Sequence, residues 1–566
     1  MIGAAQPPIE LTGLIKLDHR AEEIFGAAQD VEWTYRDGRF YLVQSRDITR
    51  LLHDTSANAA ARGEYARVLD RVNGAAPDEV VFAQNELAEM LPRPTPLSLS
   101  LMEALWASGG SVDLACRSLG ISYGVEEDAP SYLLTIFGRL YIDKRQERVR
   151  AGLVSAIAAR RLKKGAERIE RQFREEFLPE YSRTVALREA VDFERLSTPD
   201  LFATLQQLRD DFVNHTHVEV DIINVTASFY FERAKKMLAE RGLDPTAHLA
   251  HVPTTVYDRI LAEAAQQPAS LRRKFLIARA GHRALHDYEL ASPRYAEAPA
   301  PLEGLCQAEA NSGHPPSDEV AEDAALMRAG KGVAEAARIA CRFQALKEDA
   351  KHHSLRELAV IRRAVLALDR RIGLEGLAFY LNFEELLALK EHPVETMREL
   401  ATERYHQSLQ FSNAAPLPPT LTIRQLERAS AGIEDHELAG DGQLRGTRVS
   451  GAGEVTGRAR VVSVADAESG RPIAGFADGD IVVSSMVHPA WLPYFGRAGG
   501  FVCTVGGWLS HTAIHAREHN LMMIVGVRGL EAIRDGSELR LQLDGSIQMV
   551  TDQPELGPVP SRLAAE

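Results

Sequence analysis

Residues 499–518 read GGFVCTVGGWLSHTAIHARE, which divides into an apolar run, a glycine turn and a helical segment. The run from Gly500 to Val505 is typical of a strand. The pair Gly506-Gly507 permits a tight turn in which a ligand can approach the backbone closely. Ser510 is a favourable N-cap for the helix that follows. We therefore expect His511 in the first turn of a helix, directly after a glycine loop.

The position of His511 predicts a particular chemistry. Backbone N–H groups and the helix dipole at a helix N-terminus favour an anion such as a phosphoryl group. A neutral imidazole at that place can act as a nucleophile and carry the phosphoryl group itself. Two alternatives stay open. His511, His515 and His519 share one helical face and could bind zinc, although Thr512 stands where a zinc protease has Glu. His511 could also be a structural residue at the start of a helix.

This stretch resembles the phosphohistidine domain of enzymes related to phosphoenolpyruvate synthase and pyruvate phosphate dikinase. In that family the histidine is phosphorylated with ATP, and a swivelling domain then delivers the group at a second site. The resemblance implies that His511 is the phosphohistidine, and that its loop includes Thr504, Gly506, Gly507, Ser510 and Arg517. The family pattern is roughly T-x-x-G-G-x-x-S-H-x-A-I-x-A-R-E, which the chain also fits at Ala513, Ile514, Ala516 and Glu518.

The composition is ordinary for a soluble protein of several domains. The chain has 566 residues, which predicts three or four domains, and 45% of them are hydrophobic. A net charge of −14 argues against a nucleic-acid surface. The four cysteines are far apart and form no CxxC, which fits a reducing cytoplasm. We find no signal peptide and no apolar run long enough for a membrane span, so we expect a cytoplasmic protein that does not bind membranes.

The N-terminal segment predicts a β-hairpin. Residues 30–35 and 39–44 alternate like strands around an Asp-Gly turn. The segment resembles the last part of an ATP-grasp nucleotide-binding domain. The resemblance implies that Glu32 and Gln44 hold Mg²⁺, and that Arg46 joins them in binding the phosphates of ATP; a carboxylate suits Mg²⁺ and a guanidinium suits phosphate. The alternative is an ordinary hairpin with a solvent-facing Glu and Arg.

The rest of an ATP-grasp domain is not found in the sequence. We therefore expect residues 1–52 to be the C-terminal segment of a nucleotide-binding domain that is completed in trans. The partner would be a separate ATP-grasp subunit, and the two chains would form a hetero-oligomer. ATP and Mg²⁺ are the cofactors that this resemblance implies.

Residues 53–411 are expected to form a mostly helical substrate-binding domain. Apolar residues recur at spacings of three and four, and three prolines between Pro92 and Pro96 exclude a helix at that point. The segment that contains these prolines resembles the entry to the central domain of rifampicin phosphotransferases. Residues 218–231 fit either a buried helix or a strand, and the family favours a helix that lines a pocket.

The first of two polar clusters in this domain begins at His282. It resembles the family segment G-H-R-x-x-x-x-E-L-x-x-P-R and is expected to be a loop between helices. His282 is a possible base for an acceptor hydroxyl, and Arg283 or Arg294 could neutralise a phosphate. The alternative is a structural salt-bridge network with Asp287 and Glu289.

The second polar cluster contains Lys347 and Lys351, which are one helical turn apart and share a face. Two cations on one face could receive a phosphoryl group during its transfer. The related antibiotic-modifying enzymes have a comparable cationic pair, usually with Arg at the first position. The alternative is a solvated helix face. His215 and His217 are further pocket candidates with weaker support.

The remaining chain completes a multidomain fold of α and α/β parts. Residues 412–447 are expected to be a linker, 448–555 a swivelling α/β phosphohistidine domain and 556–566 a tail. The order of domains resembles rifampicin phosphotransferases and the phosphohistidine subunits of phenylphosphate and 4-methylphenyl phosphate synthases. A phosphoenolpyruvate barrel, which needs about 250 residues, is not expected after residue 552.

We therefore predict an enzyme, one subunit of an ATP-dependent phosphotransferase that acts on a small phenolic hydroxyl such as that of phenol or a cresol. By family chemistry, ATP would give AMP and phosphate. Two alternatives remain. The chain could be a subunit of an antibiotic phosphotransferase, or a non-catalytic scaffold or regulatory relative.

Overall fold

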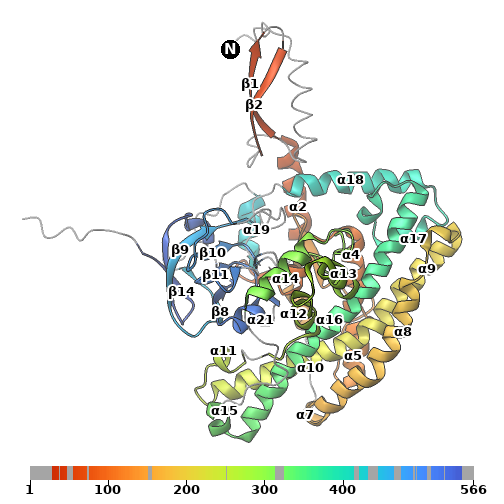
Figure 1. The fold of residues 1–566 in the computed structure, drawn as a ribbon. Helices are drawn as coiled ribbons and strands as arrows, with labels where there is room; N and C mark the ends of the chain where they lie inside the picture. Colours follow the sequence, from red (N-terminus) through yellow and green to blue (C-terminus); the bar gives the residue numbers. More distant parts are fainter. Residues whose placement is uncertain are drawn as a thin grey trace, which may run out of the picture.

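The computed structural model describes most of the chain. The residues described are 29–36, 39–47, 55–72, 75–150, 156–249, 252–312, 324–412, 420–430, 444–463, 473–487, 491, 494–506, 511–527 and 529–550. They form a large, mostly helical body, a smaller body built on a sheet, and an N-terminal hairpin above α2 (Thr55–Arg71) at the top of Figure 1. No helix in these ranges is both long and apolar enough to cross a bilayer.

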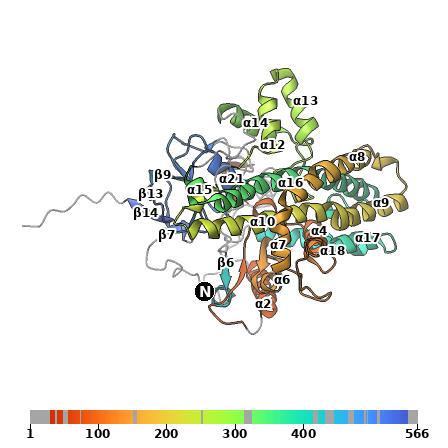
Figure 2. The same cartoon turned by 90° about the horizontal axis from the view of Figure 1, so that it is seen from below.

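The helical body is organised around α16 (Lys331–Ile372), a helix of 42 residues that ends at Gly373 in the left-handed conformation. It packs lengthwise against α10 (His217–Ala239) and also contacts α9 (Thr198–Asp211) (Figures 1 and 2). Residues 218–231, whose sequence fits a buried helix or a strand, therefore lie within a helix. The remaining longer helices are α4 (Pro96–Trp106), α5 (Ser111–Leu119), α7 (Ala156–Arg171), α8 (Leu178–Glu189), α12 (Val256–Ala265), α13 (Ala269–Ala280), α14 (Ala300–Ser312) and α18 (Val394–Ser412).

The proline-rich stretch contains no helix from Pro92 to Thr95, as the sequence predicts, and α4 begins at its last proline, Pro96. Thr95 is its N-cap, and the side chain of Thr95 accepts a hydrogen bond from the backbone N–H of Ser98. Proline is tolerated in the first turn because the N–H that it lacks would have no helical partner there.

A four-stranded antiparallel sheet beside the helices was not predicted. Its order is β4-β5-β3-β6, and its strands are β3 (Val80–Ala83), β4 (Leu133–Ile136), β5 (Arg139–Asp143) and β6 (Thr420–Thr422). Strand β6 and α19 (Ile423–Ser430) come from the segment that we expected to be linker. Leu421 and Leu426 are buried in a shared core with Phe82 and Tyr141, so residues 420–430 belong to the helical body and not to a free tether.

The C-terminal body is an eight-stranded mixed sheet in the order β7-β14-β13-β9-β10-β11-β12-β8. The neighbours from β9 to β12 are parallel, and the outer pairs are antiparallel. Alternate strand residues enter two separate cores: Val482 and Phe501 face one, and Ile481 and Val502 face the other. The strands are β7 (Leu444–Arg445), β8 (Thr447–Ser450), β9 (Val455–Val461), β10 (Ile481–Ser484), β11 (Gly500–Cys503), β12 (Met522–Val525), β13 (Glu538–Leu541) and β14 (Ser546–Val550).

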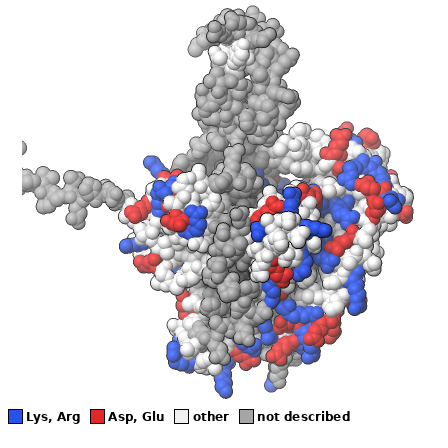
Figure 3. All heavy atoms as spheres, in the orientation of Figure 1, with Lys and Arg blue, Asp and Glu red and all other residues white. Residues whose placement is uncertain are grey.

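Charged side chains of both signs are interspersed over the helical body on the face shown in Figure 3. This face therefore presents no broad field of one sign, in agreement with the mixed composition of 65 basic and 79 acidic residues.

We predict that the stability of the helical body depends on the buried face of α16. Leu358 is fully buried in its core, so Leu358→Ala should lower the free energy of unfolding by about 2–5 kcal/mol, as expected for a cavity in a packed core. Leu187 is 74% exposed on α8, and Leu187→Ala should change it by less than about 0.5 kcal/mol. Urea unfolding followed by circular dichroism measures both variants. If Leu358→Ala and Leu187→Ala lower the free energy of unfolding by the same amount, this assignment of the core is wrong.

Candidate active site between the two domains

The structure places His511 at the first residue of α21 (His511–Glu518), which follows β11 and the glycine turn. Gly506 has a φ of 152°, and a Cβ there would come within 2.9 Å of Val525 Cγ1, so a larger residue would be strained. Thr504 Oγ1 donates a hydrogen bond to the carbonyl oxygen of Ser485 at 2.6 Å, which joins the loop to the end of β10. The side chain of His511, together with Gly507 and Ser510, lies outside the described residues.

Arg517, which the resemblance places in the phosphohistidine loop, lies near the other end of α21. Its side chain is buried, and Nη1 donates to the carbonyl oxygen of Val449 at 3.4 Å. Arg517 therefore ties the helix to β8. This contact helps to fix the orientation of α21.

Helix α21 meets the helical body through the residue that follows His511. The hydroxyl of Thr512 is 3.5 Å from Oε2 of Glu89, which belongs to the short helix α3 (Leu87–Met90). In Figures 1 and 2, α21 lies on the side of the sheet that faces α12, α14 and α16. A small cavity of about 40 Å³ is shared by the two bodies, and its lining includes Thr512, Glu89, Arg283 and Lys351. Arg283 and Lys351, one from each of the two polar clusters, thus line the same small cavity as Thr512, the second residue of α21.

Arg283 is buried and paired with Asp287. Its Nη2 lies 2.5 Å from Oδ2 of Asp287, and its guanidinium stacks 4.1 Å from the ring centre of Tyr257. Burial alone would raise the pKa of the Asp287 carboxyl, but the charge and hydrogen bond of Arg283 lower it to about 2. The salt-bridge alternative is therefore confirmed for this pair. Glu289 does not join it, since its carboxylate accepts from Thr95 and from Ser98 Oγ.

His282 lies in the loop between α13 and α14, as expected, but faces α16. Its Nε2 is 2.8 Å from the backbone carbonyl oxygen of His352, so Nε2 is the donor and carries the proton. Burial is the main cause that lowers the pKa of His282 to about 3. His282 is not among the residues that line either of the two cavities described for this site, which weakens its assignment as the base for an acceptor.

Lys347 and Lys351 lie on α16 and point into a second, much larger cavity. Lys347 Nζ is 2.9 Å from Oε2 of Glu86, and Lys351 Nζ is 2.5 Å from Oε2 of Glu348. Burial opposes the charge of Lys347, but Glu86 and Glu348 raise its pKa. Only 5% of Lys351 is exposed, so the alternative of a solvated helix face is wrong for this residue.

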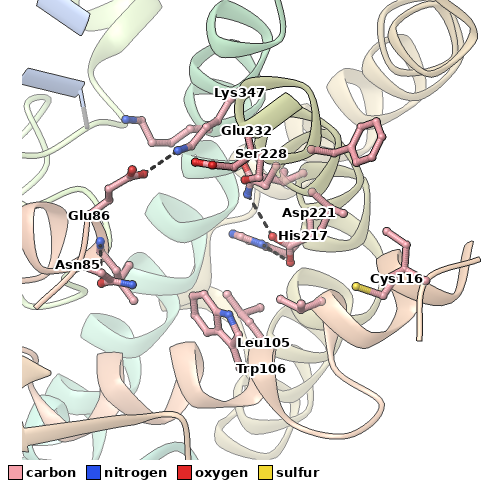
Figure 4. A pocket seen from close by; sticks show the side chains of 18 of the residues that line it. Asn85, Glu86, Leu105, Trp106, Cys116, His217, Asp221, Ser228, Glu232 and Lys347 are labelled. Carbon is pink, nitrogen blue, oxygen red and sulfur yellow. Dashed lines mark hydrogen bonds and ion pairs between the residues drawn. The ribbon is translucent and has the colours of Figure 1, made fainter. Parts of the chain in front are cut away.

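The larger cavity has a volume of about 1150 Å³ and lies between α4, α5, α10 and α16. Figure 4 shows the Lys347–Glu86 pair at one side, with Trp106 and Leu105 from α4 across the space. Glu89, Met90 and Lys351 line both cavities, so the large cavity adjoins the small one where Thr512 lies. The apolar part of the lining includes Met102, Leu105, Trp106, Val112, Ile121, Tyr123, Val220, Val225, Phe229 and Met237.

Of the two further pocket candidates, only His217 lies in the cavity wall. His215 is exposed and does not line the cavity, whereas His217 is buried in the cavity wall. Nδ1 of His217 is 3.4 Å from Oδ2 of Asp221, one helical turn further along. The i, i+4 spacing of His and Asp in the sequence was the available signal, although it occurs often by chance.

The N-terminal hairpin is present as β1 (Gln29–Arg36) and β2 (Arg39–Asp47). Glu32 is directly opposite Gln44 in its register, and Arg46 is opposite Asp30. The backbone thus brings positions 32 and 44 together, as a shared Mg²⁺ site requires. Their side chains lie outside the described part of the structure. Elsewhere in that part, no group of three or more His, Cys, Asp or Glu could hold a metal ion.

Comparison with known proteins supports the interpretation of the C-terminal body. Residues 476–547, which include β10, β11, α21 and β12, match the family model of the PEP-utilising enzyme, mobile domain. This part of the chain is therefore similar to the mobile domain of PEP-utilising enzymes, and the matched segment includes His511.

Several relatives are rifampicin phosphotransferases. The protein from Streptomyces sviceus is 31% identical over 221 residues, which cover 37% of this chain and 24% of the relative. The one from Bacillus cereus is 23% identical and aligns with 96% of this chain and 68% of its own length. The phosphoenolpyruvate synthase of Aeropyrum pernix is 30% identical over 132 residues, or 23% of this chain and 15% of the relative. The chain thus spans about a quarter of the Streptomyces protein and about two thirds of the Bacillus one.

We predict that histidines around the site make the protein less stable in mild acid. Burial lowers the pKa of His282 to about 3 and that of His353 to about 4, from an ordinary value of 6.5. Between these values the unfolded chain binds more protons than the folded one, so stability falls as the pH falls. One such histidine contributes a slope of up to about 1.4 kcal/mol per pH unit.

The variant His282→Gln lacks this titrating group, so its free energy of unfolding should fall less steeply with falling pH than that of the wild type. Urea unfolding of the variant and the wild type, measured at several pH values from neutral to mildly acidic, gives both slopes. If the free energy of unfolding falls with pH by the same amount in the variant and in the wild type, the prediction is wrong.

Proposed function

We propose that this chain is a phosphotransferase subunit in which His511 carries a phosphoryl group to a hydroxyl acceptor bound in the large cavity. The observation that carries the proposal is the junction of the two bodies. The helix that begins at His511 meets a small cavity with Arg283 and Lys351 in its wall, and Lys351 also lines the large cavity. The phosphohistidine loop, the cationic side chains and an acceptor site therefore adjoin one another.

The first half-reaction would load His511. We propose that a separate ATP-grasp subunit binds ATP and Mg²⁺, and that ATP gives AMP and phosphate. Mg²⁺ would neutralise charge on the ATP phosphates. Glu32 and Gln44, opposite each other in the hairpin, would contribute to the metal site, and Arg46 would contact the phosphates. The C-terminal domain would then swivel from that site to the helical body.

The second half-reaction would take place where α21 contacts the helical body. The ammonium groups of Lys347 and Lys351 lie in fixed positions in the cavity wall, each held by a carboxylate. Preorganised charges of this kind stabilise the charge that develops on a phosphoryl group during transfer, because they need not reorient. A small phenol is a suitable acceptor, since its pKa of about 10 makes it easier to deprotonate than an alcohol.

The volume of the cavity favours a second candidate, a larger acceptor. Pockets for drug-sized ligands measure about 300–1000 Å³, and this cavity has about 1150 Å³ with a mainly apolar wall on one side. A phenol would occupy a small part of this space. An antibiotic-sized hydroxyl compound would fill it, and several relatives are named rifampicin phosphotransferases.

We predict that His511→Ala abolishes both half-reactions, because the P–N bond can no longer form. The measurement is acid-labile phosphate on the intact protein after incubation with ATP and a candidate ATP-grasp subunit. His515→Ala, one turn further along α21, is the matched control and should label normally. Product formation by His511→Ala would refute the assignment, and no labelling of the wild type with any partner would favour a scaffold.

We predict that Val225→Trp separates the two acceptor classes. Val225 lines the large cavity on α10, so an indole there should reduce transfer to rifampicin by at least about tenfold and leave transfer to phenol or 4-cresol nearly unchanged. Discharge of labelled enzyme by each acceptor gives the rates. Val461→Trp, at an exposed position on β9, is the control. If the wild type transfers only to phenols, the larger acceptor is excluded.

A further inference from the structure

A carboxylate–imidazole pair forms part of the wall of the large cavity. His217 is 4% exposed, and its Nδ1 faces Oδ2 of Asp221 at 3.4 Å. Both residues lie on α10 and line the cavity together with Tyr288 and Lys351. In Figure 4 the imidazole points away from Asp221 into the space bordered by Trp106, Glu86 and Lys347. The pair is therefore directed at the site proposed for the acceptor.

Asp221 is held in place by other polar groups. Ser111 Oγ donates to Oδ2 at 2.6 Å, and Asn224 Nδ2 donates to Oδ1 at 3.1 Å. Ser111 is at the start of α5, so the carboxylate is bound from two elements and has little freedom to turn. A carboxylate fixed in this way can fix the ring that it contacts.

The ring of His217 is also confined by its neighbours. The Phe212 ring lies edge-on at 4.9 Å between centroids, and the Tyr288 ring lies at 6.2 Å. The contact with a carboxylate requires that Nδ1 carry the proton when the ring is neutral. Nε2 then has its lone pair free, and this atom is buried without a hydrogen-bond partner among the described residues.

Nε2 of His217 is an unpaired acceptor atom in the wall of a large cavity, and the hydroxyl of a bound ligand could donate the missing hydrogen bond to it. A buried polar atom without a partner is unfavourable, so a bound donor would be stabilised there. His282, the base expected from the sequence, does not line the cavity and uses its Nε2 proton on a backbone carbonyl. His217 has the geometry that His282 lacks.

We propose that His217 is the general base that takes the proton from the acceptor hydroxyl, and that Asp221 is its positioning residue. This inference rests on the proposed function. The acceptor oxygen forms a bond to phosphorus, while the P–N bond to His511 breaks and its electron pair returns to the imidazole of His511. When the other ring nitrogen of phosphorylated His511 carries a proton, the ring leaves as neutral imidazole. The acceptor's proton passes to Nε2 of His217 and then to solvent.

The test separates loading of His511 from its discharge. Full-length protein is phosphorylated with phosphoramidate, a chemical donor to histidine, and His511→Ala gives the background. Discharge in a single turnover is then followed with phenol, 4-cresol, 2-naphthol and rifampicin over a range of concentrations. The variants are His217→Gln, His217→Ala, Asp221→Asn and, as a matched control, His215→Gln at the exposed position two residues away.

We expect His217→Gln to load as the wild type does and to discharge about 10²- to 10⁴-fold more slowly, the usual contribution of a general base. Added imidazole should restore part of the rate in His217→Ala, since the vacated site lies in a large cavity. Asp221→Asn should lower the rate constant and leave the half-saturating acceptor concentration within about twofold. His215→Gln should behave as the wild type.

Other outcomes overturn the inference. Discharge of His217→Gln at the wild-type rate excludes a base at this position while leaving the phosphohistidine function intact. A higher half-saturating concentration with an unchanged rate constant, and no rescue by imidazole, would make His217 a binding residue only. Loading without discharge of the wild type by any of the four acceptors would refute the base role together with the proposed acceptor site. Failure of the wild type to load above the His511→Ala background would refute the phosphohistidine function itself.

Discussion

One buried helix carries the charges on which the site depends. Lys347 and Lys351 are one turn apart on α16, and each ammonium group is held by a carboxylate in the wall of the large cavity. Burying a charge is unfavourable unless it is paired, so these positions require Glu86 and Glu348. Because Glu86 lies just before α3, which also contributes Glu89 to the contact with Thr512, the pairing of Lys347 joins the cavity to the domain junction.

The same region contains a second buried pair, Arg283 with Asp287, in the loop after α13. The charges of Arg283 and Asp287 neutralise each other, and both residues also line the small cavity beside Thr512. The structural and the functional interpretations of Arg283 are therefore compatible. A guanidinium already fixed by Asp287 and by the Tyr257 ring would be preorganised for the phosphoryl group that we propose α21 carries.

The agreement between sequence and structure is closest where a local pattern is sufficient. The start of α21 at His511 follows from residues that are adjacent in the chain, as does the hairpin of β1 and β2. The agreement fails where distant segments pair. Strand β6 adds to β3 across more than 300 residues, and no local pattern in a proline-rich segment predicts that partner. The two histidines illustrate the same limit, since a motif drew attention to His282, which lines neither cavity, while His217 lines the large one.

By itself, the sequence determined the start of a helix at His511, the helical character of the central region and the two polar clusters, because each depends on backbone preference or on neighbours within a few turns. Only the tertiary structure decided which polar residues meet. It set Lys351 between two cavities, turned His282 toward a backbone carbonyl and placed His217, with Nε2 buried and unpaired among the described residues, in the wall of the large cavity. The physical reason is that a cavity is formed by the faces of several helices, and the packing of those faces is a long-range property of the whole chain.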